Sequence, residues 1–341
     1  MIMFENHPVD NVLAFFKDKR VLVTGAGGFI GSHLSRWFYN NDVFVRAVDI
    51  KWDDFIKDQY FSEKNTLDLR YLDNCMKAVE DIDFVFNFAA NMGGIGFITS
   101  VGAEVMYDNV LINTYMAKAS VDCKVQRFFF SSSACVYPTY KQTVIDVTSL
   151  KESDAIPADP DNYYGWEKIF TEKVLEAFTR DCNLDVRIAR FHNIYGPEGT
   201  YKGGREKSPA ALCRKVAEAS DPGEIEIWGD GNQTRSYCYI DDCLEGILRL
   251  MVSVCRDPLN IGSDRLISIN DLAEMIIEIS GKTILKTHDL DAPQGVRGRN
   301  SDNTELRRVL NWEPRTSLEE GIKNTYSWIE SMVAIDAQSS V

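Results

Sequence analysis

The sequence predicts an α/β fold, in which a doubly wound parallel sheet is followed by a smaller C-terminal substrate-binding domain. Over residues 20–190, short apolar and β-branched runs alternate with longer amphipathic stretches. Strands that alternate with helices form parallel sheets with both faces covered. The 341 residues, 45% of them hydrophobic, are enough for two domains. We expect the sheet domain at 1–190, a mainly substrate-binding domain at 191–330 with some segments returning to the sheet, and a flexible tail at 331–341.

Strand and helix signals follow one another in a regular order. Helices are expected at 32–39, 68–79, 104–121 and 164–179, and strands, where β-branched and aromatic residues gather, at 21–23, 43–48, 84–88, 128–130 and 186–190. Glycine and proline break this rhythm after Gly196, and helices return at 240–251 and 268–279. We expect this second domain to cap the carboxyl edge of the sheet, where ligands of open α/β sheets bind.

Composition and charge exclude several classes of function. The net charge of -14 disfavours binding to nucleic acid or anionic lipid, and the lack of a long apolar run excludes a membrane span. The eight cysteines form no C-x-x-C pair and only four histidines are present, which favours a reduced, cytoplasmic protein without a metal. Residues 201–215 nevertheless carry five basic side chains and one acidic side chain. This segment predicts a site for a small anion.

A glycine-rich loop follows the first strand directly and opens the first helix. Gly25 suits a tight turn, Gly28 lets the backbone approach a pyrophosphate, and Gly31 lets the helix pack closely. Asp49 ends the next strand, where a carboxylate binds the ribose diol of NAD and disfavours a 2′-phosphate. NAD is therefore the predicted cofactor. The residues of the loop expected to contact it are Gly25, Gly28, Phe29, Ile30 and Gly31.

A tyrosine and a lysine stand four residues apart in a predicted helix. This spacing places Tyr164 and Lys168 on one face. We expect the ammonium group to lower the pKa of the phenol from its usual value of about 10, so that Tyr164 becomes a usable base. Ser133 supplies a hydroxyl that shares the transferred proton. Cys135, two residues further on, is an unusual neighbour, although a single cysteine is more often a small buried residue.

The glycine spacing together with Tyr164 and Lys168 resembles the extended short-chain dehydrogenase/reductase family, Rossmann enzymes that act largely on nucleotide sugars. The resemblance implies that Ser133, Tyr164 and Lys168 form a catalytic triad, and that the tyrosine and lysine also contact NAD. It further implies that Asp68 and Leu69, at the end of a strand, flank the adenine.

Five longer blocks extend the resemblance over nearly the whole chain. They look like members of this family that epimerise a GDP-sugar at C3 and C5, and they lie at 91–98, 133–138, 190–197, 203–207 and 295–300. The resemblance implies an isomerase in which bound NAD oxidises C4 transiently and then reduces it again. It assigns the acid/base roles at C3 and C5 to Cys135 and Lys207. It also implies a homodimer through the helices at 104–121 and 164–179.

The chemistry of a ketone explains these roles. A C–H bond beside a carbonyl is acidic because the carbanion delocalises as an enolate, so oxidation at C4 activates C3 and C5 together. Inversion needs one group to remove a proton and another to return one on the opposite face. Cys135 suits this task near neutral pH, as does Lys207 if burial and nearby Arg205 lower its pKa.

Substrate anchoring follows from charge, because two phosphates need several cations and the guanidinium fork suits them best. Arg299 is the first candidate, with Arg297, Lys215 and Arg235 behind it. The complete set of expected substrate-binding residues is Gly93, Asn193, Glu206, Lys207, Lys215, Gln233, Arg235, Arg297 and Arg299.

Other functions remain open at this point. The nearest is another NAD-retaining nucleotide-sugar epimerase or a 4,6-dehydratase. A dehydratase is expected to carry an Asp-Glu pair after its catalytic hydroxyl, where this chain has Ala134-Cys135, and a simple 4-epimerase needs neither the thiol nor Lys207. A more distant alternative is a non-catalytic dinucleotide-binding sensor on the same fold. Such a sensor has no need for Ser133, Tyr164 and Lys168 together.

Overall fold

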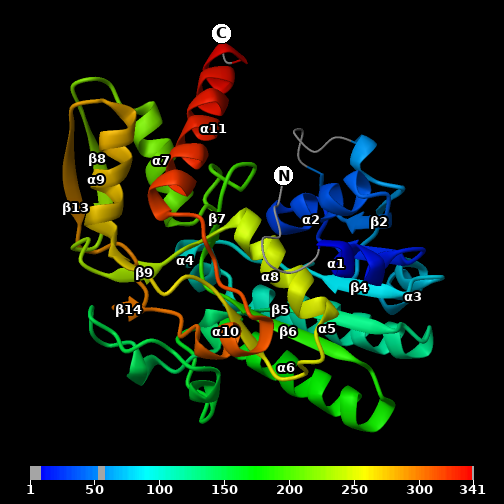
Figure 1. Cartoon of the computed structure of the whole chain (residues 1–341). Coiled ribbons are helices and arrows are strands. Elements are labelled where there is room, and N and C mark those ends of the chain that lie inside the picture. Colours follow the sequence, from blue (N-terminus) through cyan, green and yellow to red (C-terminus); the bar gives the residue numbers. More distant parts are fainter. Residues whose placement is uncertain (1–8, 53–57, 340–341) are drawn as a thin grey trace.

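The protein is built around one parallel sheet of seven strands (Figure 1). The computed structural model describes residues 9–52 and 58–339. The strands lie in the order β11-β6-β5-β4-β1-β2-β3. The chain runs outward from β1 in both directions, so the switch point lies between β1 and β4. The bounds are Arg20–Thr24 (β1), Phe44–Asp49 (β2), Glu63–Thr66 (β3), Phe84–Asn87 (β4), Arg127–Ser133 (β5), Val186–Phe191 (β6) and Leu259–Ile261 (β11).

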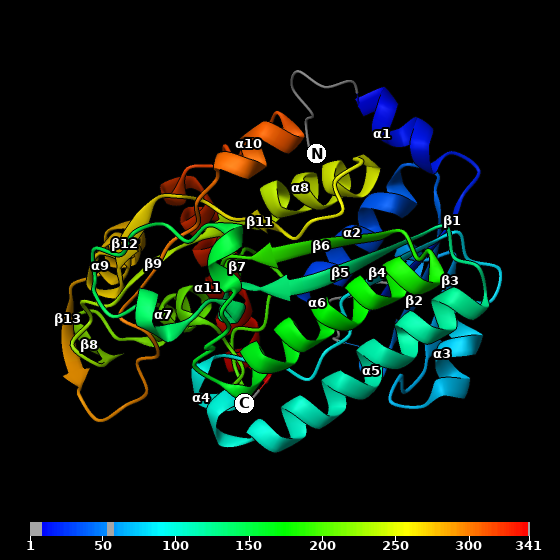
Figure 2. The same cartoon turned by 90° about the horizontal axis from the view of Figure 1, so that it is seen from below.

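Helices cover both faces of this sheet (Figure 2). On one face lie α3 (Leu72–Val79), α5 (Gly102–Asp122) and α6 (Tyr163–Cys182), whose apolar residues share a buried cluster with the strands. On the other face, α2 (Phe29–Asn40) and α8 (Ile240–Val252) pack against a second cluster, and α1 (Val9–Phe16) packs against α8. The predicted fold class, a doubly wound parallel sheet, is confirmed.

The edge of the sheet shows where sequence patterns were misleading. The hydrophobic pattern gave no signal for strand β3, because its four residues are polar and an edge strand needs no apolar run; only the family resemblance implied a strand end nearby, at Asp68 and Leu69. Helix α3 begins at Leu72 rather than at 68, and α2 begins at Phe29 rather than at 32. The glycine loop is therefore shorter than the sequence suggested, and it leads at once into the helix.

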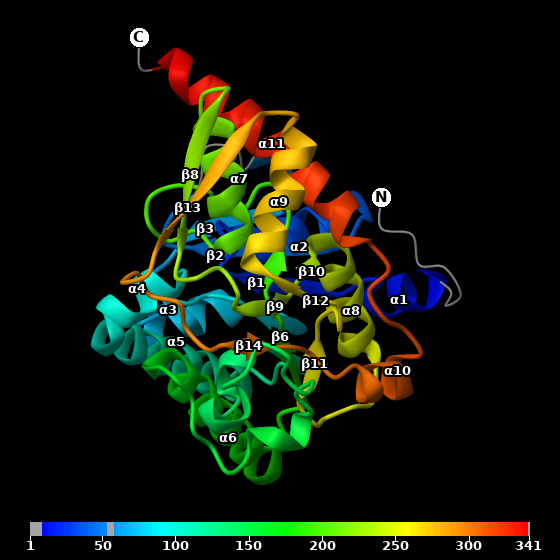
Figure 3. The same cartoon turned by 90° about the vertical axis from the view of Figure 1, so that its left-hand side faces the viewer.

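A smaller group of elements lies beside the sheet (Figure 3). Helices α7 (Ser208–Glu218), α9 (Ile269–Ser280) and α11 (Leu318–Ser339) pack against one another, and strands β8 (Gly223–Trp228) and β13 (Ile284–Asp289) form a parallel pair. Three short strands form a further sheet in the order β12-β9-β14. Their bounds are Leu266–Ser268, Thr234–Ser236 and Gly298–Arg299, and a last pair joins β7 (Ile194–Tyr195) to β10 (Cys238–Tyr239).

The C-terminal segment differs from the expected flexible tail. Helix α11 continues through Ser339 and so covers most of residues 331–341, while 340–341 lie outside the described residues. Its last turns are tied to the body of the protein, because Tyr201 Oη and Lys202 Nζ donate to the carboxylate of Asp336 at 2.7 and 2.5 Å. Within the described ranges, no helix is both long and apolar enough to cross a membrane.

Candidate active site

The loop after β1 forms a tight cradle at the N-terminus of α2. Gly25 has a φ of +67°, and a Cβ there would lie 2.8 Å from the backbone nitrogen of Ala89. A Cβ on Gly31 would lie 2.2 Å from the carbonyl oxygen of Gly25. Gly28 precedes the helix, and Phe29 and Ile30 are its first residues. The five loop residues expected at the pyrophosphate are therefore drawn together at one helix N-terminus.

Asp49, the residue expected at the ribose, ends β2 and lies beside this cradle. One carboxylate oxygen accepts a hydrogen bond from the backbone N–H of Gly27 at 2.9 Å, and the other accepts from Ile50 and Lys51 at 2.7 and 3.1 Å. Sequence reasoning did not single out Gly27, yet a Cβ there would lie 1.9 Å from the Lys51 carbonyl oxygen. The glycine is needed for the turn after β2 to reach the loop.

Asp68 and Leu69 lie beyond β3, which ends at Thr66, so they do not end the strand as expected. Leu69 is buried, whereas Asp68 is bound by the guanidinium group of Arg70. The N–H groups of Arg70 donate to its two carboxylate oxygens at 3.0 and 2.7 Å. These hydrogen bonds lower the pKa of Asp68.

The predicted triad is brought together where β5 meets α6. Ser133 ends β5, and its Oγ accepts a hydrogen bond from the backbone N–H of Cys135 at 3.1 Å. The side chains of Ser133 and Tyr164 are hydrogen-bonded. Lys168 Nζ lies 5.3 Å from the centre of the Tyr164 ring. Gly165 lets the start of α6 approach the backbone of Cys135, because a Cβ at this position would lie 2.2 Å from the Cys135 carbonyl oxygen.

The electrostatics of the triad differ from the sequence-based expectation. Burial raises the pKa of Tyr164, as do Cys135 and Glu167, while the hydrogen bond from Ser133 acts in the opposite direction. The expected lowering of this pKa by Lys168 is therefore wrong for the structure described here, because desolvation of the phenolate outweighs the nearby cation. Burial also lowers the pKa of Lys168 itself.

Sequence reasoning missed the carboxylate beside this lysine. Glu167 Oε2 lies 3.8 Å from Lys168 Nζ, and its Oε1 accepts hydrogen bonds from Asn113 Nδ2 at 2.6 Å and Thr171 Oγ1 at 2.9 Å. All four side chains are buried. Glu167 and, after it, Glu172 raise the pKa of Lys168 against the effect of burial. Helical periodicity gave no sign of this contact, because adjacent residues do not share a helix face.

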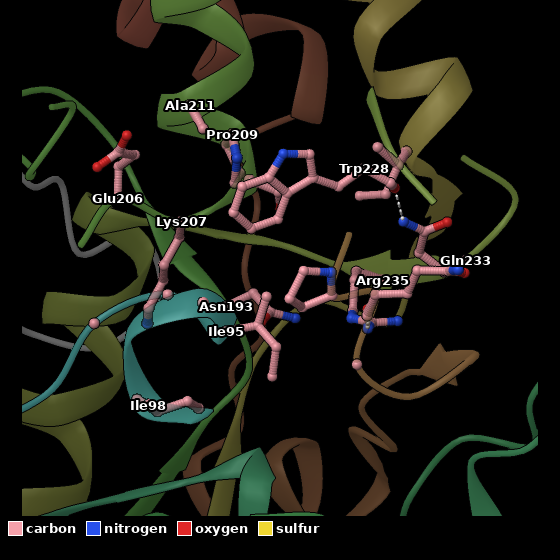
Figure 4. Close-up of a pocket in the computed structure, with 18 of the residues that line it drawn as sticks. Ile95, Ile98, Asn193, Glu206, Lys207, Pro209, Ala211, Trp228, Gln233 and Arg235 are labelled. Carbon is pink, nitrogen blue, oxygen red and sulfur yellow. Dashed lines mark hydrogen bonds between the residues drawn. The ribbon is translucent and has the colours of Figure 1, made fainter. Parts of the chain in front are cut away.

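One cavity connects the triad to the second group of elements, and Figure 4 shows part of its wall. Ser133, Cys135 and Tyr164 line it from the sheet side, while Lys207 reaches in from the residue before α7. The side chain of Lys207 is open to the cavity but surrounded by protein, and this enclosure lowers its pKa, while Cys135 acts in the opposite direction. Arg205 was expected to contribute but instead contacts Asn91 and Met92.

Arg299 contacts the predicted acid/base thiol. Its Nη1 donates to Cys135 Sγ at 3.3 Å, its Nε donates to Gln142 Oε1 at 2.6 Å, and its Nη2 lies 3.5 Å from Asp161 Oδ1. Gln142 is buried, and its own amide N–H groups donate to the carbonyls of Tyr137 and Pro138. Arg299 was expected at the phosphates, but these contacts hold it beside Cys135. Sequence reasoning missed Gln142 and Asp161, which lie far from Arg299 along the chain.

Most of the other residues expected to bind the substrate line the cavity. They are Gly93, Asn193, Glu206, Lys215, Gln233 and Arg235. Gln233 Nε2 donates to the Trp228 carbonyl at 2.9 Å (Figure 4), while its buried Oε1 has no hydrogen-bond partner among the described residues. Burial, with Arg299 nearby, lowers the pKa of Arg235 to about 10.

Arg297 is the exception among the expected substrate-binding residues. Its two terminal nitrogens donate to the carboxylate oxygens of Asp230 at 2.9 and 3.1 Å, and it does not line the cavity. The expectation that Arg297 supports Arg299 at the phosphates is therefore not met, because its charge is already neutralised outside the cavity.

Comparisons with known proteins agree with this geometry. Residues 21–262 match the model of the NAD dependent epimerase/dehydratase family. The chain belongs to this family. It is 48% identical to GDP-mannose 3,5-epimerase 1 of Oryza sativa subsp. indica, over 92% of this chain and 82% of that protein. The GDP-mannose 3,5-epimerase of Arabidopsis thaliana is 47% identical, over 92% and 83%. The names of these two relatives state the activity of the family members that the five sequence blocks resemble.

A solved structure supports the same family. The UDP-glucose 4-epimerase of Thermotoga maritima, solved with UDP-glucose, superposes with a TM-score of 0.83 at 27% identity, over 92% of this chain and 99% of that one. The residues of this chain fit NAD, because the glycine loop ends at the N-terminus of α2, where a pyrophosphate binds, and the Asp49 carboxylate is fixed beside it. NAD is the cofactor of this family by its description.

Proposed function

We propose that the protein is a GDP-mannose 3,5-epimerase, which converts GDP-D-mannose to GDP-L-galactose without net oxidation. Relatives of that name match nearly the whole chain. The observation that carries the proposal is that Cys135 and Lys207 line the same cavity as Ser133 and Tyr164. A 4-epimerase or a 4,6-dehydratase has no use for this cysteine and lysine.

Each proposed catalytic residue acts at a defined step of the reaction. Tyr164, hydrogen-bonded to Ser133, accepts the proton of the C4 hydroxyl, and Lys168 holds positive charge behind the phenol. NAD, when bound, supplies the hydride acceptor and later the hydride donor. The C4 ketone makes C3 and C5 acidic, and Cys135 and Lys207 exchange their protons from opposite faces. Returning the proton from Tyr164 restores the alcohol.

The anchoring of the substrate follows from the cavity wall. Of the cations predicted to bind the two phosphates, Lys215 and Arg235 remain on the cavity wall once Arg299 is assigned to Cys135. Glu206 Oε2 and Gln233 Oε1 are buried acceptors without a hydrogen-bond partner among the described residues. Both line the cavity, so hydroxyl groups of the sugar or N–H groups of the base would satisfy them.

Product analysis tests the proposal. The protein, purified with its cofactor, is incubated with GDP-mannose, and the sugar is identified by proton NMR. We expect GDP-L-galactose, with a change of configuration at both C3 and C5. A sugar changed only at C4 would indicate a 4-epimerase, a 4-keto-6-deoxy sugar would indicate a dehydratase, and unchanged substrate under all conditions would indicate a sensor. Any of these three results contradicts the proposal.

We further propose a homodimer through α5 and α6. Four large aromatic side chains on these two adjacent helices are exposed: Tyr107 (67%), Tyr163 (62%), Trp166 (40%) and Phe170 (45%). A large exposed apolar surface marks an interface between proteins. A reducing, cytoplasmic location agrees with the eight cysteines, all of which are free.

A further inference from the structure

Arg205 binds the loop that follows β4, and the proposed chemistry does not use it. Its Nη1 donates to Asn91 Oδ1 at 3.1 Å and to the Met92 carbonyl at 3.3 Å. Its guanidinium carbon lies 3.8 Å from the centre of the Phe97 ring. The Gly94 N–H donates to the Arg205 carbonyl at 3.0 Å. Side-chain, aromatic and backbone contacts therefore join residues 91–97 to Arg205.

These contacts hold the segment that carries Lys207 on its N-terminal side. Gly203 and Gly204 come directly before Arg205, with φ values of +91° and +81°. Nothing lies within 4 Å of the position of a Cβ at either glycine, so side-chain packing does not fix the chain there. Lys207 follows Arg205 by two residues and precedes α7. Arg205 thus fixes the segment between a glycine pair and the residue that enters the cavity.

The partner of Arg205 is itself rigidly held. The backbone N–H of Asn91 donates to Asn109 Oδ1 at 2.6 Å, and its carbonyl accepts from Asn109 Nδ2 at 3.1 Å. Asn91 Nδ2 donates to Asp108 at 3.0 Å, and Asp108 accepts from Arg70 at 3.1 Å. Arg70 in turn binds Asp68. A continuous series of hydrogen bonds leads from the residue expected at the adenine to Arg205.

We propose that Arg205 is a positioning residue that holds Lys207 at the sugar and couples this position to the cofactor side through Asn91, Asp108 and Arg70. The proposal rests on the proposed function, because it takes Lys207 as an acid/base group. Hydride transfer at C4 depends on Tyr164 and Lys168, with which Arg205 itself shares no hydrogen bond or ring contact. Loss of Arg205 is therefore expected to separate proton exchange from hydride transfer.

The test compares both steps in one variant. Arg205→Met keeps an unbranched side chain but removes every donor. In deuterated buffer with GDP-mannose, C4 oxidation is followed by the absorbance of reduced nicotinamide, and deuterium at C3 and C5 is followed by NMR. We expect deuterium incorporation to slow at least about tenfold, since small displacements of a reacting group are costly, and C4 oxidation to stay within about threefold.

Lys202→Met is the matched control, because Lys202 lies in the same basic segment but binds Asp336 on α11. It is expected to leave both rates unchanged. Equal slowing of both steps by Arg205→Met, or no slowing of exchange, would overturn the proposal. Should that variant fail to fold, Phe97→Leu removes the ring under the guanidinium group and keeps an apolar side chain in its place. We expect it to slow exchange about twofold to fivefold and to leave C4 oxidation within about threefold; unchanged exchange would overturn the proposal. Absence of deuterium with the wild-type protein would instead refute the proposed function.

Discussion

Cys135 differs from an ordinary strand-end cysteine through the groups around its sulfur. The Arg299 guanidinium donates to it at 3.3 Å, and Lys207 lines the same cavity. Gln142 and Asp161 keep Arg299 in place. The sulfur thus accepts a hydrogen bond from a cation that a buried structural cysteine would not need. This arrangement supports a role in moving protons rather than in packing.

Cys135→Ala tests that role at the level of one residue. The variant keeps Ser133, Tyr164 and Lys168, so we expect it to retain bound NAD and to oxidise C4, while deuterium incorporation at C3 and C5 falls by about 100-fold or more. Cofactor content and NMR measure the two properties. Cys182→Ala, at an exposed cysteine in the same protein, should behave as wild type. Loss of cofactor from Cys135→Ala would mean that the cysteine is structural.

Lys207 is expected to lower the stability of the folded protein, because a catalytic lysine must be enclosed in the cavity. Enclosure lowers its pKa, so at pH values below that pKa the folded protein holds a charge that the unfolded chain solvates better. This cost disappears as the pH rises through the folded and then the unfolded pKa. Lys207→Met should therefore raise Tm at pH 7, and by less at pH 10, while abolishing proton exchange. An equal Tm gain at both pH values in thermal unfolding would contradict the explanation.

At the scale of elements, the start of α2 is the least tolerant position. A Cβ on Gly31 would lie 2.2 Å from a backbone oxygen that cannot move independently of the loop. We expect Gly31→Ala to lower the free energy of unfolding by about 1–3 kcal/mol and to reduce bound NAD after gel filtration. Asn40→Ala, at the exposed end of the same helix, should change neither. Wild-type stability and NAD content in Gly31→Ala would refute the close-packing argument.

Sequence patterns predicted the elements that carry strong periodicity. The central strands, the glycine loop and the helix with Tyr164 and Lys168 have signals within one window. Strand β3 lacked such a signal because its residues are polar, and only the last turns of α11 fall in the stretch predicted as a flexible tail. Contacts between distant segments could not be predicted either. The binding of Arg299 by Gln142, 157 residues away, depends on the folded chain.

At the scale of the whole molecule, the cavity exists only because two parts of the chain meet. Cys135 comes from the short 3-10 turn that follows β5, and Lys207 comes from the segment before α7. The sheet side supplies Ser133 and Cys135, whereas the second side supplies Lys207 and the cations proposed to bind the phosphates. In the proposed function, the residues for oxidation at C4 therefore come from the sheet side, and epimerisation also needs a residue from the second group of elements.

The proposed dimer is tested by placing a charge on the α5/α6 surface. A glutamate in an apolar interface must be desolvated without a partner, so Phe170→Glu should weaken the dimer by about 100-fold or more. Analytical ultracentrifugation would show monomers at micromolar concentration. Leu285→Glu places the same charge at an exposed leucine on β13 and should leave the dimer intact. A monomeric wild-type protein would contradict the interface.

Deuterium exchange tests the central claim most directly, namely that Cys135 and Lys207 turn a reversible oxidation into an epimerisation. The wild-type protein is incubated with GDP-mannose in deuterated water, and the sugar protons are followed by NMR. The account predicts deuterium at both C3 and C5 and none at C4, because the hydride returns from the cofactor to the carbon it left. A sugar that carries no deuterium at C3 and C5 would contradict it.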